Sequence, residues 1–337
     1  MNVTVKSTCE IIFISIVILN RGSDENSVKS IVDQVKYHHR SIDAFYTQDE
    51  SCKIIISDQF TQPLLQEVGT SFQYFNVRSE GVFSTVLDHP WSGNVDISKT
   101  AMINGCPLPR MQYVAQFLSS LEHLQANIIF IDTDTLILGD LREVFVKYPD
   151  LDIGFTMGGH YVKKQDPNHF INVGVIFIGK NRIANTSKLL KFISQYCTSI
   201  SSELLNKVIL DQYSTFQVLE RYKVDTVKGT LMGKNIVGDC IIVDVSSSPV
   251  RVYFLSEEFN TLGKKLYKAS KVAHYVGDSK EKMRMIRMGK VLLGEGLEIF
   301  MKRCSHRVLK SARSLSKFPL KCKSDFRQVS SKVTYNE

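Results

Sequence analysis

The chain has 337 residues, of which 43% are hydrophobic and 23% are charged, as is ordinary for a globular protein. This length and apolar content allow one large or two small folded domains. The net charge of +8 comes from one segment, because residues 302–323 hold eight Lys or Arg and no Asp or Glu. The rest of the chain is therefore near neutral, and the basic balance says little about what it binds.

The cysteines and the N-terminus give a first indication of the compartment. Seven cysteines are dispersed without a C-x-x-C pair, at residues 9, 52, 106, 197, 240, 304 and 322. This pattern argues against a disulfide framework and a zinc site, and it favours a reducing compartment. The apolar run from Ile11 to Leu19 is nine residues long, against roughly 20 needed to cross a bilayer. We expect a cytoplasmic protein with neither a signal peptide nor a transmembrane segment.

The first 80 residues alternate between strand and helix patterns. Strands are predicted at Glu10–Leu19, Lys53–Ser57 and Phe72–Val77, with helices at Ser27–His38 and Pro63–Val68 between them. This β-α-β-α-β order predicts a parallel sheet with right-handed crossovers. Glycine-rich dinucleotide and P-loop motifs do not occur in the sequence.

The middle of the chain begins with an irregular stretch over residues 79–108. A helix is predicted next at Pro109–Leu118, followed further along by strands at Leu151–Thr156 and Ile171–Ile178 and a helix at Ser187–Tyr196. A long irregular stretch inside a compact domain indicates either a functional loop or secondary structure that the pattern does not reveal.

The stretch Asn127–Leu141 carries the clearest chemical signal. Four apolar residues, Ile128 to Ile131, run directly into Asp132-Thr133-Asp134, and a second apolar run follows. The first run predicts a strand buried on both faces, with two carboxylates at its carboxyl end. Paired acids there are costly to desolvate without a positive partner, so we expect a divalent cation that carries substrate phosphates.

This stretch resembles the D-x-D region of GT-A glycosyltransferases, and is closest to the glycogenin-like type of glycosyltransferase family 8. Further motifs follow in the order of that family, over roughly residues 10–280. Ile171-Asn172-Val173-Gly174-Val175 resembles its N-x-G-V strand, Asp211-Gln212 resembles its D-Q pair, and His274 to Lys280 resembles its H-x-x-G-x-x-K segment.

The resemblance implies a fold and a set of roles. The fold is α/β, a Rossmann-like GT-A domain with a mixed, mainly parallel central sheet over 1–280 and a helical, basic C-terminal tail over 281–337. The metal, Mn²⁺ or Mg²⁺, would be held by Asp132, Asp134 and His274. The donor nucleotide sugar would also contact a further set of residues: Leu19, Asn20, Arg110, Thr133, Gly277 and Lys280. The sugar would be oriented by Asn172, Asp211 and Gln212.

The implied reaction transfers a sugar from a nucleoside diphosphate sugar, a UDP-sugar above all, to a hydroxyl group with retention of anomeric configuration. The acceptor, whether a glycan, a protein or a small molecule, has no readable motif. Two alternatives stay open at this point. One is a Mg²⁺-dependent phosphatase of the haloacid-dehalogenase type with Asp132 as nucleophile, although its D-x-D-x-T box needs Thr where this chain has Leu136. The other is a non-catalytic protein that binds a nucleotide sugar.

Within the basic segment 302–323, apolar residues recur at helical intervals. Such a segment can lie on an anionic membrane surface as a peripheral contact, or it can pack on the catalytic domain. Aromatic residues for base stacking are too few there for nucleic-acid binding to be expected.

Overall fold

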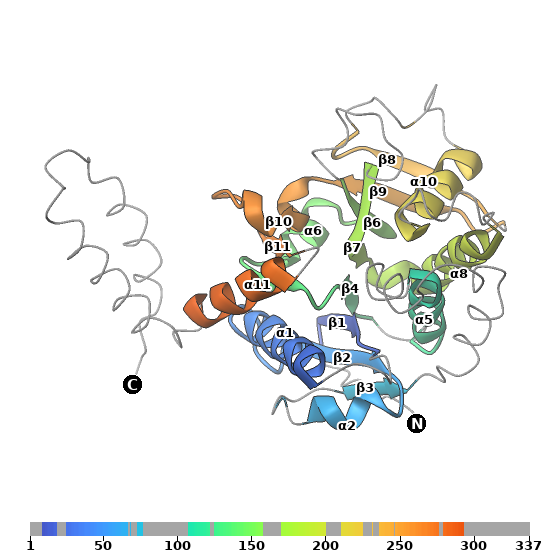
Figure 1. Ribbon diagram of the computed structural model, residues 1–337. Coiled ribbons are helices and arrows are strands. Elements are labelled where there is room, and N and C mark those ends of the chain that lie inside the picture. Colours follow the sequence, from blue (N-terminus) through green and yellow to red (C-terminus); the bar gives the residue numbers. More distant parts are fainter. Residues whose placement is uncertain are drawn as a thin grey trace, which may run out of the picture. The chain divides into compact units, whose positions relative to one another are not determined.

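The computed structural model describes residues 9–18, 25–66, 68, 73–76, 107–121, 125–157, 170–199, 210–224, 231, 236–245, 247–275 and 279–292. The chain divides into two compact units, Met1–Leu293 and Gly294–Glu337, and all described residues belong to the first (Figure 1). The basic segment 302–323 lies outside the described residues. Within the described part, no helix combines the length and the apolar content needed to cross a membrane.

The centre of the first unit is an eight-stranded mixed sheet. Its order is β3 (Gln73–Asn76), β2 (Ser51–Ser57), β1 (Ile11–Ile16), β4 (Asn127–Ile131), β7 (Ile171–Ile178), β6 (Ile153–Met157), β9 (Val250–Leu255) and β8 (Cys240–Val243). Strands β3, β2, β1 and β4 run parallel. Strand β7 runs antiparallel to both of its neighbours, while β6 and β9 are parallel. The predicted α/β class with a mixed, mainly parallel sheet is therefore confirmed.

The strands form because their apolar residues are buried on both faces. In β4, Ile128 and Phe130 join the core cluster that includes helices α5 and α8, while Ile129 and Ile131 join the cluster on the opposite face. Figure 1 shows α1 and α11 on one side of the sheet and α5, α8 and α10 on the other. The helices span α1 (Glu25–Asp43), α2 (Thr61–Gln66), α5 (Pro107–Ser119), α6 (Arg142–Lys147), α8 (Ile183–Ser199), α10 (Leu210–Tyr222) and α11 (Ser279–Leu292).

A second, three-stranded sheet stands beside the first and is absent from the sequence prediction. Its order is β10 (Thr261–Leu262), β11 (Val272–His274) and β5 (Thr135–Ile137). Strand β11 is parallel to β10 and antiparallel to β5, with His274 opposite Thr135. The short 3₁₀ helix η4 (Glu257–Asn260) leads into β10. This sheet brings a late segment of the chain against the residues that follow β4.

Two sequence expectations need correction. The predicted first strand reaches Leu19, whereas β1 ends at Ile16. The dispersed cysteines argued against a disulfide framework, yet one pair, Cys9 and Cys52, is bonded, with Cα atoms 5.9 Å apart. They meet because they lie at the starts of the adjacent parallel strands β1 and β2, a proximity that a sequence separation of 43 residues conceals. The compartment in which the protein resides stays a prediction.

Candidate metal centre

Two carboxylates and one imidazole converge beyond the carboxyl end of β4. Asp132 and Asp134 lie in the turn between β4 and β5, and His274 ends β11. His274 Nε2 lies 3.0 Å from an Asp134 carboxylate oxygen and 3.7 Å from one of Asp132. The three ligand atoms lie within 4.8 Å of one another. The structure therefore joins residues that are about 140 positions apart in the sequence.

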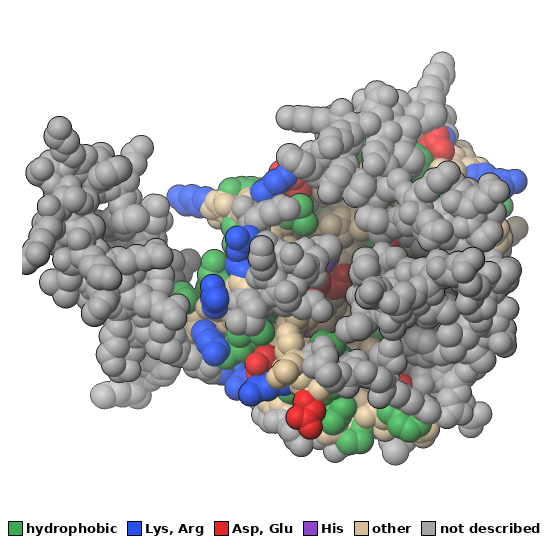
Figure 2. Space-filling view, viewed as in Figure 1, with side chains coloured by type: hydrophobic (Ala, Val, Ile, Leu, Met, Phe, Trp, Pro, Cys, Tyr) green, Lys and Arg blue, Asp and Glu red, His purple; other side chains and the backbone are tan. Residues whose placement is uncertain are grey.

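The cluster faces outward on its acidic side. The side chains of Asp132 and Asp134 are 24% and 27% exposed, whereas His274 is 4% exposed. Thr133, between the two acids, is partly exposed as well. In Figure 2, acidic and histidine surface lies near the middle of the face. A cation held by these three residues would keep coordination positions on the solvent side, where a ligand can approach.

An irregularity in β7 makes room for the cluster. The pairing of β7 with β6 shifts between Phe155, which faces Ile176, and Thr156, which faces Asn172. Gly174 lies between Asn172 and Ile176, in the part of β7 where the regular pairing with β6 is interrupted. Its carbonyl accepts a hydrogen bond from Asp132 N at 2.9 Å. A Cβ on Gly174 would lie 2.3 Å from His274 Cε1 and 3.0 Å from an Asp132 carboxylate oxygen. A residue without a side chain is therefore required here.

The donor set fits a divalent cation. Carboxylate oxygens suit Mg²⁺ and Mn²⁺, and a neutral imidazole suits transition ions such as Mn²⁺. The second ring nitrogen of His274, Nδ1, lies 2.8 Å from the side-chain oxygen of Asn260. This contact leaves Nε2 directed at the two carboxylates, as a metal ligand requires.

A buried histidine supports the acidic turn from behind. His38 of α1 donates from Nδ1 to the Thr135 carbonyl at 3.0 Å, and its Nε2 accepts from the Ser15 hydroxyl at 3.1 Å. Burial lowers the pKa of His38 to about 4, so the ring is neutral at physiological pH. The Thr135 hydroxyl in turn donates to the Asp132 carbonyl at 2.6 Å. These bonds fix the backbone of the turn that presents both acids.

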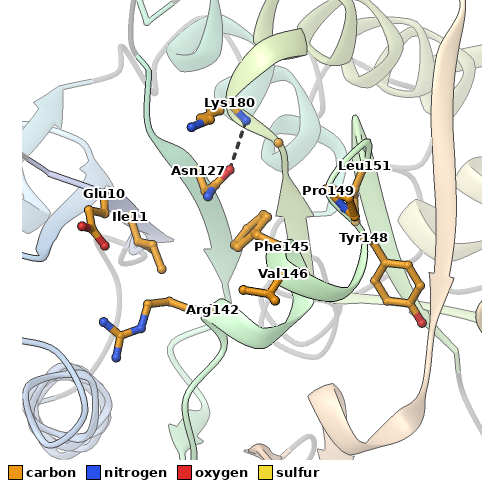
Figure 3. A pocket seen from close by; sticks show the side chains of 11 residues that line it. Glu10, Ile11, Asn127, Arg142, Phe145, Val146, Tyr148, Pro149, Leu151 and Lys180 are labelled. Atoms are coloured by element: carbon orange, nitrogen blue, oxygen red, sulfur yellow. Dashed lines mark hydrogen bonds between the residues drawn. The ribbon is translucent and has the colours of Figure 1, made fainter.

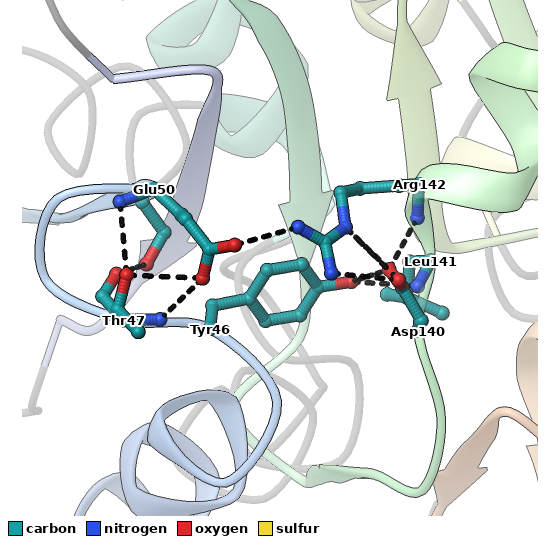
Figure 4. Close-up of polar contacts among 7 residues, drawn as sticks. Tyr46, Thr47, Glu50, Asp140, Leu141 and Arg142 are labelled. Carbon is teal, nitrogen blue, oxygen red and sulfur yellow. Dashed lines mark hydrogen bonds and ion pairs between the residues drawn. The ribbon is translucent and has the colours of Figure 1, made fainter.

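A polar network anchors the segment that follows β5 (Figure 4). The Tyr46 hydroxyl donates to Asp140 at 3.0 Å and accepts from Leu141 N at 2.6 Å. Arg142 binds both carboxylate oxygens of Asp140 through Nε and reaches Glu50 through an N–H at 2.8 Å. The backbone is therefore held just after the two acids, where His38 binds Thr135, and again after β5, where Tyr46 and Arg142 bind Asp140 and Leu141.

The residues expected to orient a sugar lie in β7 and in α10. The Asn172 side-chain oxygen accepts a hydrogen bond from Gly174 N at 2.9 Å, so it shapes the irregular part of β7. Asp211 and Gln212 lie in the first turn of α10, where Asp211 is 4% exposed and accepts from Gln212 N at 2.8 Å. Their role toward a sugar stays a prediction.

The other expected donor contacts come from several segments of the chain. Leu19, Asn20 and Gly277 lie outside the described residues. Arg110 falls within α5, and Lys280 falls within α11. All five assignments stay predictions.

Sequence reasoning missed Asn260, Thr156 and His38. Asn260 and Thr156 are buried polar residues beside the cluster, and His38 lies behind it. None of them belongs to a recognisable spacing. Thr156 alone gave a signal, because it is a polar residue in a predicted strand that is mostly apolar.

A cavity of about 370 Å³ lies at the other end of the strands (Figure 3). It opens where β1 and β4 begin, and Asn127 there accepts from Lys180 N at 3.2 Å. Its lining also includes Arg142, whose guanidinium is already bound to Asp140 and Glu50. In sheets with parallel strands, ligands bind beyond the carboxyl ends. This cavity is therefore separate from the metal centre.

No family model matches the chain, and no curated protein matches it in sequence. Among solved structures, the galactosyltransferase LgtC bound to donor and acceptor sugar analogues is similar over 82% of this chain and 95% of its own, with 11% identity and a TM-score of 0.44. An active-site variant of LgtC is similar over 79% and 88%, with 10% identity and a TM-score of 0.42. Mouse xyloside xylosyltransferase 1 in its apo form is similar over 60% and 80%, with 10% identity and a TM-score of 0.35.

Proposed function

We propose that the chain is a metal-dependent glycosyltransferase of the glycogenin-like family 8 type, with a GT-A domain. It would transfer a sugar from a UDP-sugar to a hydroxyl group of an acceptor, with retention of anomeric configuration. The observation that carries the proposal is the convergence of Asp132, Asp134 and His274 beyond the carboxyl end of β4. This is the edge at which sheets of this kind bind nucleotide ligands.

In this proposal the chain's own residues bind and orient the donor. Asp132, Asp134 and His274 hold the cation, Mn²⁺ in preference to Mg²⁺ because one ligand is an imidazole. When bound, the cation supplies positive charge against the departing diphosphate. Lys280 adds a second positive charge there, and Gly174 leaves the space beside β7 that His274 and an Asp132 carboxylate oxygen occupy. Asn172, Asp211 and Gln212 hydrogen-bond the sugar hydroxyls.

The remaining assignments of the proposal concern the rest of the donor and the acceptor. The nucleotide and diphosphate contact a set of residues from four segments, namely Leu19, Asn20, Arg110, Thr133 and Gly277. The acceptor is a glycan, a protein or a small molecule with a free hydroxyl group. The basic segment 302–323 provides a peripheral contact with anionic membranes.

The phosphatase alternative is less well supported by the geometry. In that reaction Asp132 is the nucleophile and the later segments of the chain have no role. The position of His274, 3.0 Å from Asp134 and behind a glycine that leaves space for it, has no explanation there.

A donor-cleavage screen tests the proposal. Purified protein is incubated with Mn²⁺ and a panel of UDP-, GDP- and ADP-sugars, and released nucleotide is measured. We expect release from one UDP-sugar, lost in Asp134→Ala and kept in the matched control Asp239→Ala, which removes an exposed carboxylate from a different part of the chain. Binding of a nucleotide sugar without cleavage would favour the non-catalytic alternative. Cleavage of a simple phosphate ester without release from any nucleotide sugar would favour the phosphatase.

A further inference from the structure

A chain of three hydrogen bonds leads from the metal centre into the sheet. His274 Nδ1 lies 2.8 Å from Asn260 Oδ1, Asn260 Nδ2 lies 2.9 Å from Thr156 Oγ1, and Thr156 Oγ1 lies 2.8 Å from the carbonyl of Asn172. All three side chains are almost fully buried, with exposed fractions of 4%, 5% and 0% for His274, Asn260 and Thr156. The chain thus links β11, η4, β6 and β7.

The far end of this chain fixes the direction of every hydrogen bond in it. A backbone carbonyl can only accept, so the single hydroxyl proton of Thr156 is donated to Asn172. Thr156 Oγ1 must then accept from Asn260, which turns the NH₂ group of the Asn260 amide toward Thr156. The carbonyl oxygen of that amide consequently faces His274.

The same logic determines the tautomer of the imidazole. Because Asn260 Oδ1 can only accept, His274 must carry its proton on Nδ1. The lone pair of the neutral ring is then on Nε2, the atom that lies 3.0 Å from Asp134 and 3.7 Å from Asp132. A metal ligand needs its lone pair on the nitrogen that faces the cation.

We propose that Asn260 and Thr156 are positioning residues, which hold His274 in the Nδ1–H tautomer and thereby make Nε2 a permanent metal donor. The inference rests on the proposed metal centre and deepens it, because it names the residues that select the donor atom of one metal ligand. The bond from Thr156 also ends on Asn172, whose side chain shapes the Gly174 segment. The metal ligand and the proposed sugar-binding strand therefore share one rigid support.

The test compares Thr156→Val with Thr156→Ser. Valine keeps the shape of the side chain but cannot accept from Asn260, whereas serine restores the hydroxyl. A matched control is Thr186→Val, because Thr186 is also fully buried and also donates to a backbone carbonyl, that of Asp152, away from the metal centre. Asn260→Ala removes the middle of the chain and serves as a second variant.

Two readouts are measured on each full-length protein. Long-range ¹H–¹⁵N NMR of the metal-free protein identifies the protonated nitrogen of His274, with the signal assigned by comparison with His274→Gln. Electron paramagnetic resonance of free Mn²⁺ gives the dissociation constant for the ion. We expect an Nδ1–H signal in the wild type, Thr156→Ser and Thr186→Val. In Thr156→Val and Asn260→Ala we expect a mixture of tautomers and a dissociation constant raised about 10- to 100-fold, the usual effect of losing an outer hydrogen-bond partner.

An Nε2–H signal in the wild type would overturn the inference, as would wild-type Mn²⁺ affinity in both Thr156→Val and Asn260→Ala. A wild-type protein that binds no Mn²⁺ would overturn it too, since no metal donor would then be held. Failure of the proposed transferase activity looks different. The Nδ1–H signal and the Mn²⁺ affinities would follow the expected pattern while no nucleotide sugar is cleaved.

Discussion

Replacing Gly174 with alanine adds one methyl group at the most crowded point of the metal centre. The new Cβ would lie 2.3 Å from His274 Cε1, 2.9 Å from His274 Nδ1 and 3.0 Å from an Asp132 carboxylate oxygen. Carbon atoms in contact normally lie about 3.5–4.0 Å apart, so something must move by more than an ångström. His274 is buried and bound to Asn260, and the carbonyl of Gly174 is bound to Asp132 N. Neither side can yield without breaking a hydrogen bond.

The expected cost has two parts. Overpacking of this kind destabilises a folded protein by about 1–3 kcal/mol, while alanine in place of glycine in a strand returns about 0.5–1 kcal/mol. The net loss in the free energy of unfolding is therefore about 0–2.5 kcal/mol without metal. Displacing His274 or Asp132 also weakens the binding of Mn²⁺, and we expect its dissociation constant to be about 10- to 100-fold higher. The extra stability gained at saturating Mn²⁺ then falls by roughly 1.4–2.7 kcal/mol.

The assay is thermal and urea unfolding with and without Mn²⁺, with Gly154→Ala as the matched control. Gly154 is also a strand glycine, in β6, and its added Cβ would lie 2.9 Å from a methyl group of Leu255. The nearest atoms that this Cβ would meet belong to the side chains of Leu255 and Leu151 and not to a metal ligand, so this control should keep the full stabilisation by Mn²⁺. Equal stabilisation of Gly174→Ala and the wild type by Mn²⁺ would refute the reasoning.

Three further predictions concern stability. Breaking the Cys9–Cys52 disulfide in Cys52→Ser should lower the free energy of unfolding by about 4 kcal/mol, the value for a closed loop of 43 residues. Dithiothreitol should destabilise the wild type but not the variant, and equal sensitivity of both proteins would contradict the bond. The pKa of buried His38 is lowered from 6.5 to about 4, so its neutral form contributes stability above pH 6.5 that is lost as the pH falls toward 4. Urea unfolding at pH 7 and pH 5 should therefore show about 2 kcal/mol less acid destabilisation in His38→Asn than in the wild type, and identical losses would count against the buried neutral ring. Tyr46→Phe should cost about 1–3 kcal/mol in urea unfolding because the Leu141 N–H loses its acceptor; an unchanged midpoint would show that water replaces the hydroxyl.

The parts of the fold that sequence predicted are those that local patterning determines. The apolar run Ile128–Ile131 is buried on both faces, as its β-branched composition indicated, and the two acids that follow lie at its carboxyl end. The early alternation of strands and helices likewise specified a parallel sheet. In each case the residues that carry the signal are neighbours in sequence.

The parts that sequence did not predict depend on contacts between distant segments. Nothing within Ile171–Ile178 determines that β7 runs antiparallel to β4, because that direction depends on the path of the intervening chain. The bond between Cys9 and Cys52 follows from strand pairing and not from cysteine spacing. Asn260 lies in a short 3₁₀ helix without a motif, and its importance becomes visible only when His274 and Thr156 are placed on either side of it.

The small sheet formed by β5 and β11 has a consequence for how the metal centre is specified. Leu136 and Ala273 face a hydrophobic cluster with Met285 of α11, while Ile137 and Val272 belong to the core cluster on the other face. A slip of one residue between these strands would exchange the two faces and turn His274 toward the α11 cluster. Burying an imidazole among those apolar side chains would be unfavourable. The alternating apolar residues of these two short strands therefore fix the register that directs His274 toward the two acids. Because a mispaired strand would be less stable whether or not a metal is bound, the protein sets this arrangement before the ion binds.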